Sequence, residues 1–360
     1  MTPPLDRNDR SAIDRNSGRS DGGVKRILIV NANWLGDVLF STPAIRAIRK
    51  ARPKAHLACL VPARCRAALA NNPNIDQVIV ADDDTSFAAW PAAWALARRL
   101  RKEKFDTAIF FHRSKTKGYV ACLAGIPERL GYDVSGLRRG LTRSCQPPVP
   151  PFHRIDYFLD LVRALGFGSD GRVPEFFPNQ EAAAELDTLF RLEGLERTEP
   201  YVVVHAGGNW DLKRWPAGHF SAWIRLFRAR FPWKVVLCGT AGEVALAEKI
   251  RAGFTDEEVV SLCGHTSFDA LALLLKDARL LLSNDSGPIH LAATQKTPVL
   301  GIFGPTSPAE TGPVSGGPVR IVTKDVGCEV PCYFRACDRR VCMEWVTPEQ
   351  VFASTEEMLA

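Results

Sequence analysis

Short apolar runs alternate with amphipathic segments along the first half of the chain. The run at 26–30, Arg-Ile-Leu-Ile-Val, is rich in β-branched residues and is typical of a strand buried on both faces. The next segment, 38–50, carries apolar residues at helical spacing. The pattern then repeats, with strands expected at 56–61, 77–81 and 107–111 and helices at 63–70 and around Trp90 and Trp94. This alternation predicts a parallel sheet covered by helices on both faces.

A second alternation begins at 201–205, beyond the proline-rich stretch 146–151. A helix expected at 155–165 precedes it. Its further expected strands are 234–238, 279–283 and 298–303. Its expected helices are 218–230, 243–252, 268–276 and one starting at 287. We expect the final helix, 348–358, to cross back to the first domain. The chain is thus predicted to be α/β, with two doubly wound Rossmann-like domains facing across a cleft at the carboxyl ends of their strands.

The predicted organisation has three parts. Residues 1–23 are polar and form a disordered lead. A first Rossmann-like domain occupies 24–178, and a second occupies 179–360 and includes a cysteine-rich tail at 328–342. The lead lacks the apolar core of a secretion signal, and no stretch approaches the roughly 20 apolar residues that a membrane-spanning helix needs. We therefore expect a cytoplasmic protein whose ten cysteines stay reduced.

Charge is unevenly distributed. The net charge is +6, but residues 1–175 hold 28 Lys and Arg against 17 Asp and Glu, whereas residues 176–360 hold 18 against 23. A basic half suggests an anionic partner such as a phosphorylated glycolipid, a membrane surface or a nucleic acid. A basic surface that is simply solvated explains the charge equally well.

Gly36 and Asp37 follow the first strand and open a helix. The glycine allows a ligand to approach closely, and the helix N-terminus supplies partial positive charge. The loop is not a G-x-G-x-x-G fingerprint, which disfavours a nicotinamide cofactor. Two roles for Asp37 remain open, a helix cap and a catalytic base.

Three loops of the second half have a similar form. Gly207, Gly208 and Lys213 follow the strand at 201–205 and could cradle a diphosphate, or could form a flexible solvated loop. The other two loops hold small and polar residues at helix starts, where they could bind phosphate, ribose or sugar, or could cap helices. These residues are Gly239, Thr240 and Glu243 in one loop, and Asp285, Ser286, Gly287 and His290 in the other.

Several motifs, correctly ordered, resemble those of the ADP-heptose:lipopolysaccharide heptosyltransferases, glycosyltransferase family 9. They are Asn33–Val38, Lys213–Pro216, Asn284–Gly287 with His290, and Gly304–Pro308, and Ala124–Pro127 makes the resemblance closest to heptosyltransferase II. The resemblance covers about residues 25 to 310, and motifs in a fixed order are more specific than any one alone.

The resemblance implies a GT-B architecture with an acceptor domain first and a donor domain second. Asp37 would be the base that deprotonates the acceptor hydroxyl in one inverting displacement, and Lys213 would stabilise the departing diphosphate. The donor would be ADP-heptose, with no metal and no cofactor expected. The donor-binding residues would come from the three loops of the second half: Gly207, Gly208, Gly239, Thr240, Glu243, Asp285, Ser286, Gly287 and His290.

The resemblance also implies an anionic acceptor, Kdo-containing lipid A core, which gives the basic first half a partner. We expect a monomer in peripheral contact with the cytoplasmic face of the inner membrane. The candidate acceptor contacts are Gly36, Arg64, Arg113, Ser114, Lys115 and Lys117. Merely solvated cations are the alternative for the charged members of this set.

The tail places cysteines at Cys328, Cys332, Cys337 and Cys342. Four thiolates could bind zinc, but the spacing is not that of a C-x2-C knuckle, so free or redox-variable thiols are the alternative. Other hypotheses for the chain are a same-family transferase with another glycan acceptor, a GT-B nucleotide-sugar epimerase and a nucleic-acid-binding zinc protein. The last is disfavoured because the basic residues are not interleaved with aromatics, and we expect no nucleic-acid partner.

Overall fold

The computed structural model describes residues 26–81, 90–134, 136–150, 152–332 and 337–360. The expected lead at 1–23 lies outside these residues, as does part of the cysteine-rich tail. No described helix is both long and apolar enough to cross a membrane.

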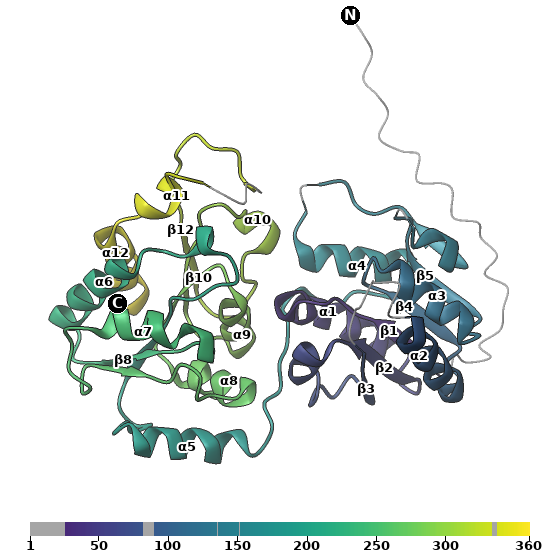
Figure 1. The fold of residues 1–360 in the computed structure, drawn as a ribbon, viewed down its shortest axis with the longest axis horizontal. Coiled ribbons are helices and arrows are strands. Elements are labelled where there is room, and N and C mark those ends of the chain that lie inside the picture. The colour runs from purple at the N-terminus through teal and green to yellow at the C-terminus, as the bar shows by residue number, and fades with distance from the viewer. Residues whose placement is uncertain (1–25, 82–89, 135, 151, 333–336) are drawn as a thin grey trace, which may run out of the picture.

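The first domain is built on a six-stranded parallel sheet in the order β3-β2-β1-β4-β5-β6 (Figure 1). This order changes direction between β1 and β4, as in Rossmann-like sheets. Its strands are β1 (Arg26–Val30), β2 (His56–Val61), β3 (Gln77–Val80), β4 (Thr107–Phe110), β5 (Glu128–Tyr132) and β6 (Arg143–Cys145).

Helices cover both faces of this sheet. In Figure 1, α1 (Leu35–Ala51) and α4 (Arg154–Ala164) lie between the sheet and the second domain, whereas α2 (Trp90–Glu103) and α3 (Lys115–Leu123) lie on the far side. The helix expected at 63–70 is instead a 3₁₀ segment, Ala63–Ala68, because the chain turns at Leu69, whose N–H donates to the Arg66 carbonyl and whose carbonyl accepts from Asn72 N at 3.1 Å.

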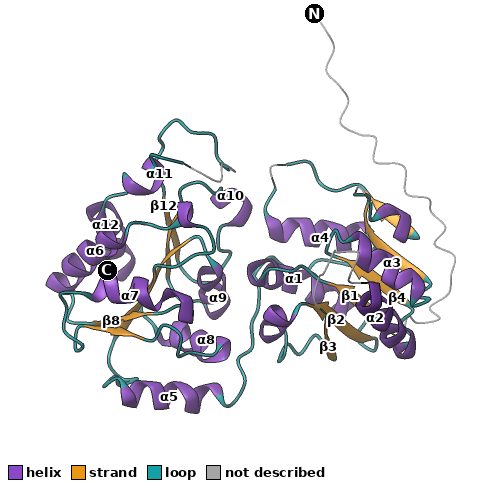
Figure 2. Ribbon diagram, viewed as in Figure 1, coloured by secondary structure: helices purple, strands orange, loops and turns teal. Residues whose placement is uncertain are grey.

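The second domain repeats this plan with a six-stranded parallel sheet in the order β12-β11-β10-β7-β8-β9. Its strands, orange in Figure 2, are β7 (Tyr201–His205), β8 (Lys234–Leu237), β9 (Val259–Ser261), β10 (Leu281–Asn284), β11 (Val299–Ile302) and β12 (Val319–Val322). The helices are α5 (Ala182–Leu192), α6 (Ala217–Arg230), α7 (Val244–Arg251), α8 (Phe268–Asp277), α9 (Gly287–Gln295), α10 (Pro308–Thr311), α11 (Val341–Glu344) and α12 (Pro348–Leu359).

The expectation that the final helix returns to the first domain is wrong. Helix α12 packs on α6 and β12, and the buried Val351 belongs to the core of the second domain. The Trp223 indole Nε1 donates to the Thr355 hydroxyl at 3.1 Å and fixes α12 in this place. The amphipathic pattern of the helix identified its buried face but not the surface that this face covers.

One buried apolar cluster runs from the first sheet to the second through α1, α4, α8 and α9. Two polar contacts also join the domains. His153 Nε2 lies 2.9 Å from the Gly312 carbonyl oxygen, and the Asn71 amide donates to Asp269 Oδ1 at 3.2 Å. The two domains are therefore packed together along one side, which fixes the facing edges of their sheets.

Candidate active site

A cleft of about 810 Å³ lies between the domains and is lined by loops that follow the strands of both sheets. The first turns of α1 and α9 meet here: the Leu35 side chain lies 3.6 Å from where a Cβ on Gly287 would be. Two helix N-termini thus open into one cleft. Their unpaired N–H groups and positive dipole ends suit an anionic ligand.

Asp37 stands on the first-domain wall, in the first turn of α1. No side chain caps this helix, so Asp37 is not held by a capping bond. Its Oδ1 instead lies 3.2 Å from Nε of Arg154, at the start of α4. Burial raises the pKa of the Asp37 carboxyl, and the Arg154 guanidinium opposes this rise only in part. A carboxylate with a raised pKa is the better proton acceptor near neutral pH.

His290 faces Asp37's helix from α9. Its ring packs edge-on against Phe40 with centroids 4.4 Å apart, and its Cδ2 lies 3.1 Å from where a Cβ on Gly36 would be. Burial lowers the pKa of His290 to about 4, so the ring is neutral at physiological pH. Gly36 and His290, which the sequence nominated separately, therefore meet across the domain interface. The absence of a side chain on Gly36 makes this close approach possible.

Lys213 and Asp285 form an ion pair on the opposite wall. Lys213 Nζ lies 2.7 Å from Asp285 Oδ2, and the Asp285 side chain is only 5% exposed. The pair joins the loop after β7 to the loop after β10, both of which the sequence nominated. The pair thus holds an ammonium at the wall of the cleft, where it could compensate negative charge on a ligand.

The Glu243 carboxylate accepts three hydrogen bonds at the edge of the cleft. Its Oε1 accepts from Gly208 N at 3.0 Å, and its Oε2 accepts from Thr240 N at 2.7 Å and the Thr240 hydroxyl at 3.0 Å. The bond from Thr240 N is one half of a capping box, in which Glu243 N donates in turn to the Thr240 side chain, so the helix-cap role weighed for Glu243 is present. Burial alone would raise the pKa of Glu243, but His205 and these donors hold it at about 2.

His205 connects Glu243 to the third loop. Its Nε2 lies 3.7 Å from Glu243 Oε2, and its Nδ1 lies 2.9 Å from the Ser286 hydroxyl. Asn284 makes a second cross-link, because its amide donates to the Ala206 carbonyl at 2.8 Å and its Oδ1 accepts from Trp215 N at 3.0 Å. Sequence reasoning assigned no role to His205 or Asn284, although each lies at the end of a buried strand inside a nominated motif.

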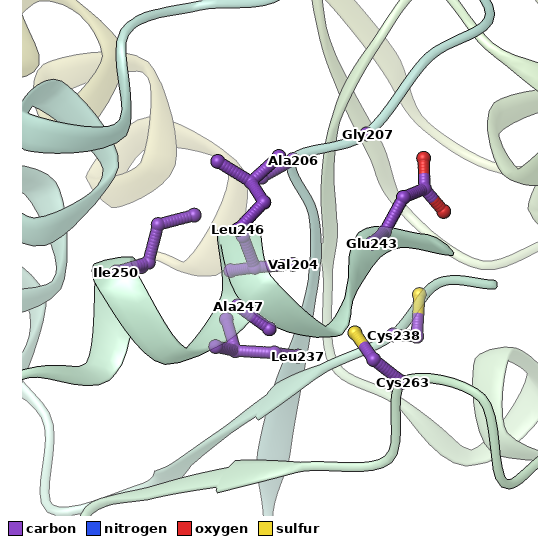
Figure 3. A pocket seen from close by; sticks show the side chains of 10 residues that line it. All are labelled: Val204, Ala206, Gly207, Leu237, Cys238, Glu243, Leu246, Ala247, Ile250 and Cys263. Atoms are coloured by element: carbon purple, nitrogen blue, oxygen red, sulfur yellow. The ribbon is translucent and has the colours of Figure 1, made fainter. Parts of the chain in front are cut away.

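Two of the expected donor-binding glycines owe their identity to Glu243. A Cβ on Gly207 would collide with the Glu243 carboxylate, and one on Gly239 would lie 2.9 Å from its Oε2. Figure 3 shows this carboxylate pointing toward the loop of Gly207, beside a cavity of only about 10 Å³ that Cys238 and Cys263 also line. Gly239 lines the large cleft, whereas Gly207 lines only the small cavity behind it, so a ligand contact by Gly207 stays a prediction.

The candidate acceptor cations divide into exposed and buried groups. Arg64 is exposed and stacks over Trp34 at 5.1 Å, and Arg113 is exposed and lies 5.2 Å from the Tyr157 ring centroid. Lys115 is also exposed, at the start of α3. These three residues lie at the carboxyl edge of the first sheet and remain available to an acceptor.

Ser114 and Lys117 do not fit that expectation. Ser114 is buried and caps α3 by accepting from Lys117 N at 3.2 Å. Lys117 is 3% exposed, and its ammonium donates to Asn33 Oδ1 at 3.2 Å, which steadies the loop before Asp37. The sequence pattern marked them as cations or hydroxyls at a strand end but could not distinguish a buried support from a surface contact.

Two buried polar atoms along the cleft have no hydrogen-bond partner among the described residues, namely His290 Nδ1 and the Thr306 hydroxyl. Buried polar groups in folded proteins are normally paired, so both atoms are suited to bind a polar group of a ligand in the cleft. Thr306 belongs to the Gly304–Pro308 motif, which was expected to border this pocket.

The cysteine-rich tail shows no metal-holding arrangement: the described part of the chain contains no group of three or more His, Cys, Asp or Glu placed to bind a metal ion. All four tail cysteines are free. Burial raises the pKa of the Cys342 thiol, and the nearby thiols, Cys337 first, raise it further. Zinc binding by the four tail cysteines stays a prediction.

Residues 93–333 match the family model of glycosyltransferase family 9 (heptosyltransferase). The chain is 26% identical over 302 residues to lipopolysaccharide heptosyltransferase 2 of Escherichia coli K12, which covers 81% of this chain and 86% of that relative. A family 9 glycosyltransferase structure from Veillonella parvula superposes with a TM-score of 0.84 at 24% identity, covering 93% and 97% of the two chains. The structure of E. coli ADP-heptose LPS heptosyltransferase II gives 0.76 at 22% identity, covering 93% and 98%.

Proposed function

The chain belongs to glycosyltransferase family 9, and from this premise we propose that it transfers heptose from ADP-heptose to the Kdo- and heptose-bearing inner core of lipid A in lipopolysaccharide biosynthesis. The observation that carries the proposal is the opposition of Asp37 on one wall to the Lys213–Asp285 pair on the other. Two helix N-termini open between them.

The proposed reaction is a single displacement. Asp37 takes the proton of an acceptor hydroxyl, whose oxygen attacks the anomeric carbon of the heptose while the bond from that carbon to the ADP oxygen breaks. Attack from the face opposite the leaving group inverts the anomeric centre. The negative charge that develops on the diphosphate is stabilised by Lys213 and by the N–H groups at the start of α9.

The fixed loops of the second domain suit the nucleotide sugar. We propose that the backbones of Gly208, Gly239 and Thr240 line the nucleotide. Glu243 would contact ribose or sugar hydroxyls, and Ser286 and His290 would hold the donor. The ammonium and the helix ends already supply positive charge beside the leaving group, so the proposed step needs neither a metal nor a cofactor.

On the acceptor side, we propose that the exposed Arg64, Arg113 and Lys115 contact phosphate and carboxylate groups of the core. The protein would act as a monomer, since both walls of the cleft come from one chain. It would work in the cytoplasm, where its ten free cysteines stay reduced, in peripheral contact with the inner membrane.

The decisive experiment is to measure ADP release from ADP-heptose with and without Kdo-lipid A that bears one heptose. We expect release that depends on the acceptor and a product heavier by one heptose. Acceptor-independent release of nucleotide would instead favour an epimerase-like activity. Binding of ADP-heptose without turnover on this acceptor, but with turnover on another glycan, would overturn the acceptor assignment alone.

A further inference from the structure

The outward face of α2 and α3 carries four large apolar side chains. Trp90 and Trp94 on α2 are 54% and 56% exposed, and Tyr119 and Leu123 on α3 are each 43% exposed. These helices lie on the side of the first sheet that is turned away from the second domain (Figure 1). Single exposed apolar residues are ordinary, but a group of them on adjacent helices marks an interaction surface.

The four side chains belong to one continuous surface. Each helix contributes a pair spaced four residues apart, which places both members on one side of the helix. The two helices pack against each other, and the Arg101 guanidinium on α2 donates to the carbonyl oxygen of Leu123 on α3. We refer to Trp90, Trp94, Arg98, Tyr119 and Leu123 as the α2–α3 face.

Basic residues accompany the aromatic ones on α2. Arg98, Arg99, Arg101 and Lys102 are all exposed, and the single acidic residue of the helix, Glu103, is paired with Arg26 at 2.8 Å. The Arg98 guanidinium lies 4.7 Å from the centroid of the Trp94 ring. Within the described helix, the face is thus aromatic and cationic, and its one carboxylate is already paired.

The direction of α2 relates this face to the cleft. The pairing of Glu103 with Arg26 fixes the end of α2 at the amino end of β1. Helix α2 therefore points Trp90 toward the opposite edge of the sheet, where Asp37 follows β1. The same edge carries the start of α3 and Lys115, so the aromatic end of the face adjoins the acceptor side of the site.

We propose that the α2–α3 face docks on a bilayer surface rich in anionic lipid. Tryptophan and tyrosine favour the headgroup level of a membrane, where an apolar ring meets water, and clustered Arg and Lys are attracted to anionic lipids. Helix α2 would lie in the interface without crossing the bilayer. The inference deepens the proposed function on which it rests, because a lipid-linked acceptor could then reach Asp37 while its acyl chains remain in the membrane.

The test is cosedimentation of the full chain with vesicles of phosphatidylglycerol and phosphatidylcholine, compared with phosphatidylcholine alone. We expect binding to the anionic vesicles that weakens with added salt. The double variant Trp90→Ser, Trp94→Ser should bind about tenfold more weakly, which is 1.4 kcal/mol. Trp345→Ser is the matched control, because Trp345 is 55% exposed in the second domain and should leave binding unchanged.

A charge variant, Arg98→Gln with Lys102→Gln, should lower binding to anionic vesicles and weaken its salt dependence, because two of the four exposed cations of α2 are neutralised. The proposal is overturned if the wild type ignores anionic vesicles or if the double tryptophan variant binds them as the wild type does. It is also overturned if that variant changes only the sedimentation coefficient of the lipid-free protein, since the face would then be covered by a second copy.

These vesicles contain neither donor nor acceptor, so the result does not depend on glycosyl transfer. Failure of the ADP-release experiment with vesicle binding intact would refute the proposed function and leave the docking surface. Conversely, the double tryptophan variant should retain the wild-type kcat on an acceptor that lacks acyl chains.

Discussion

The two walls of the cleft hold their polar groups in different ways. We call the second-domain side, which we propose binds the donor, the donor wall, and the first-domain side the acceptor wall. On the donor wall, the Asp285 carboxylate is nearly buried and its Oδ2 lies 2.7 Å from Lys213 Nζ, and Glu243 accepts three hydrogen bonds from the surrounding loops. On the acceptor wall, Asp37 has one ion pair with an arginine that is 39% exposed, and Arg64 and Arg113 rest on aromatic rings at the surface. The polar groups of the donor wall are largely buried and held by several bonds, whereas the cations of the acceptor wall are exposed and each Nε makes one hydrogen bond, from Arg64 to the Asn33 carbonyl at 2.9 Å and from Arg113 to the Tyr157 hydroxyl at 3.2 Å.

This difference matches what each wall would have to recognise. A nucleotide sugar has one shape, and a preorganised site binds it without paying to order its own side chains. A branched, phosphorylated glycolipid would offer dispersed negative charge, which guanidinium groups exposed at the surface can contact. The charge distribution agrees, because the first half of the chain is strongly basic and the second is mildly acidic.

The largest effect should come from Asp37→Asn on the acceptor wall. The amide cannot accept the proton, so we expect kcat to fall by about 10³ while the affinity for ADP-heptose stays unchanged. Single-turnover rates and calorimetric titration of the donor measure the two quantities. An Asp37→Asn enzyme with near-normal kcat would show that another group is the base.

Lys213→Met tests the fixed pair of the donor wall. We expect kcat to fall by about 10² because the leaving diphosphate loses its ammonium. The free energy of unfolding should also fall by about 3 kcal/mol, since a buried carboxylate is left unpaired. Adding Asp285→Asn should restore much of the stability, measured by urea unfolding, but none of the rate. Recovery of the rate would mean that the pair is only structural.

The sequence predicted the fold wherever strands are apolar on both faces. The runs at 26–30, 56–61 and 201–205 coincide with β1, β2 and β7. The pattern missed short or polar strands such as β5 and β6, because Glu-Arg-Leu-Gly-Tyr and Arg-Ser-Cys carry no continuous apolar run. These strands form through pairing with a neighbour that is already in place, which no local pattern records.

The candidate site was predictable where a motif follows a strand directly. Asp37, Lys213, Asp285 and His290 all line the cleft as expected. Arg154 could not be found in this way, because it lies at the start of α4 and reaches Asp37 only through the packing of α4 on α1. Lys117 shows the opposite limit, since its place after a strand gave no sign that its ammonium is turned inward toward Asn33.

Two glycines in equivalent helix positions allow a substitution in the cleft to be compared with the same substitution outside it. Gly36 and Gly218 are each the second residue of a helix, α1 and α6. A Cβ on Gly218 meets nothing within 4 Å, so Gly218→Ala should stabilise the protein by about 0.5–1 kcal/mol. In Gly36→Ala the new Cβ presses on the His290 ring at 3.1 Å, so this gain should be lost and kcat/KM should fall by about tenfold. The measurements are the thermal unfolding and the steady-state rates of both variants. If both variants gained the same stability and kept the same kcat/KM, α1 and α9 would have to separate freely in solution.

The smallest effect at neutral pH should come from Arg154→Gln, and its pH dependence is what identifies the role. Burial raises the pKa of Asp37 and Arg154 lowers it, so removal of the guanidinium raises that pKa further. Because the base works only when deprotonated, the acidic limb of the kcat/KM profile should move to higher pH, with the wild-type rate regained at alkaline pH. Arg163→Gln is the control, since Arg163 pairs with Asp160 at 2.7 Å on the same helix and should leave the profile unchanged. A uniform loss of rate at every pH would instead mean that Arg154 binds the acceptor directly. The guanidinium would then leave Asp37 and contact the acceptor when the acceptor binds.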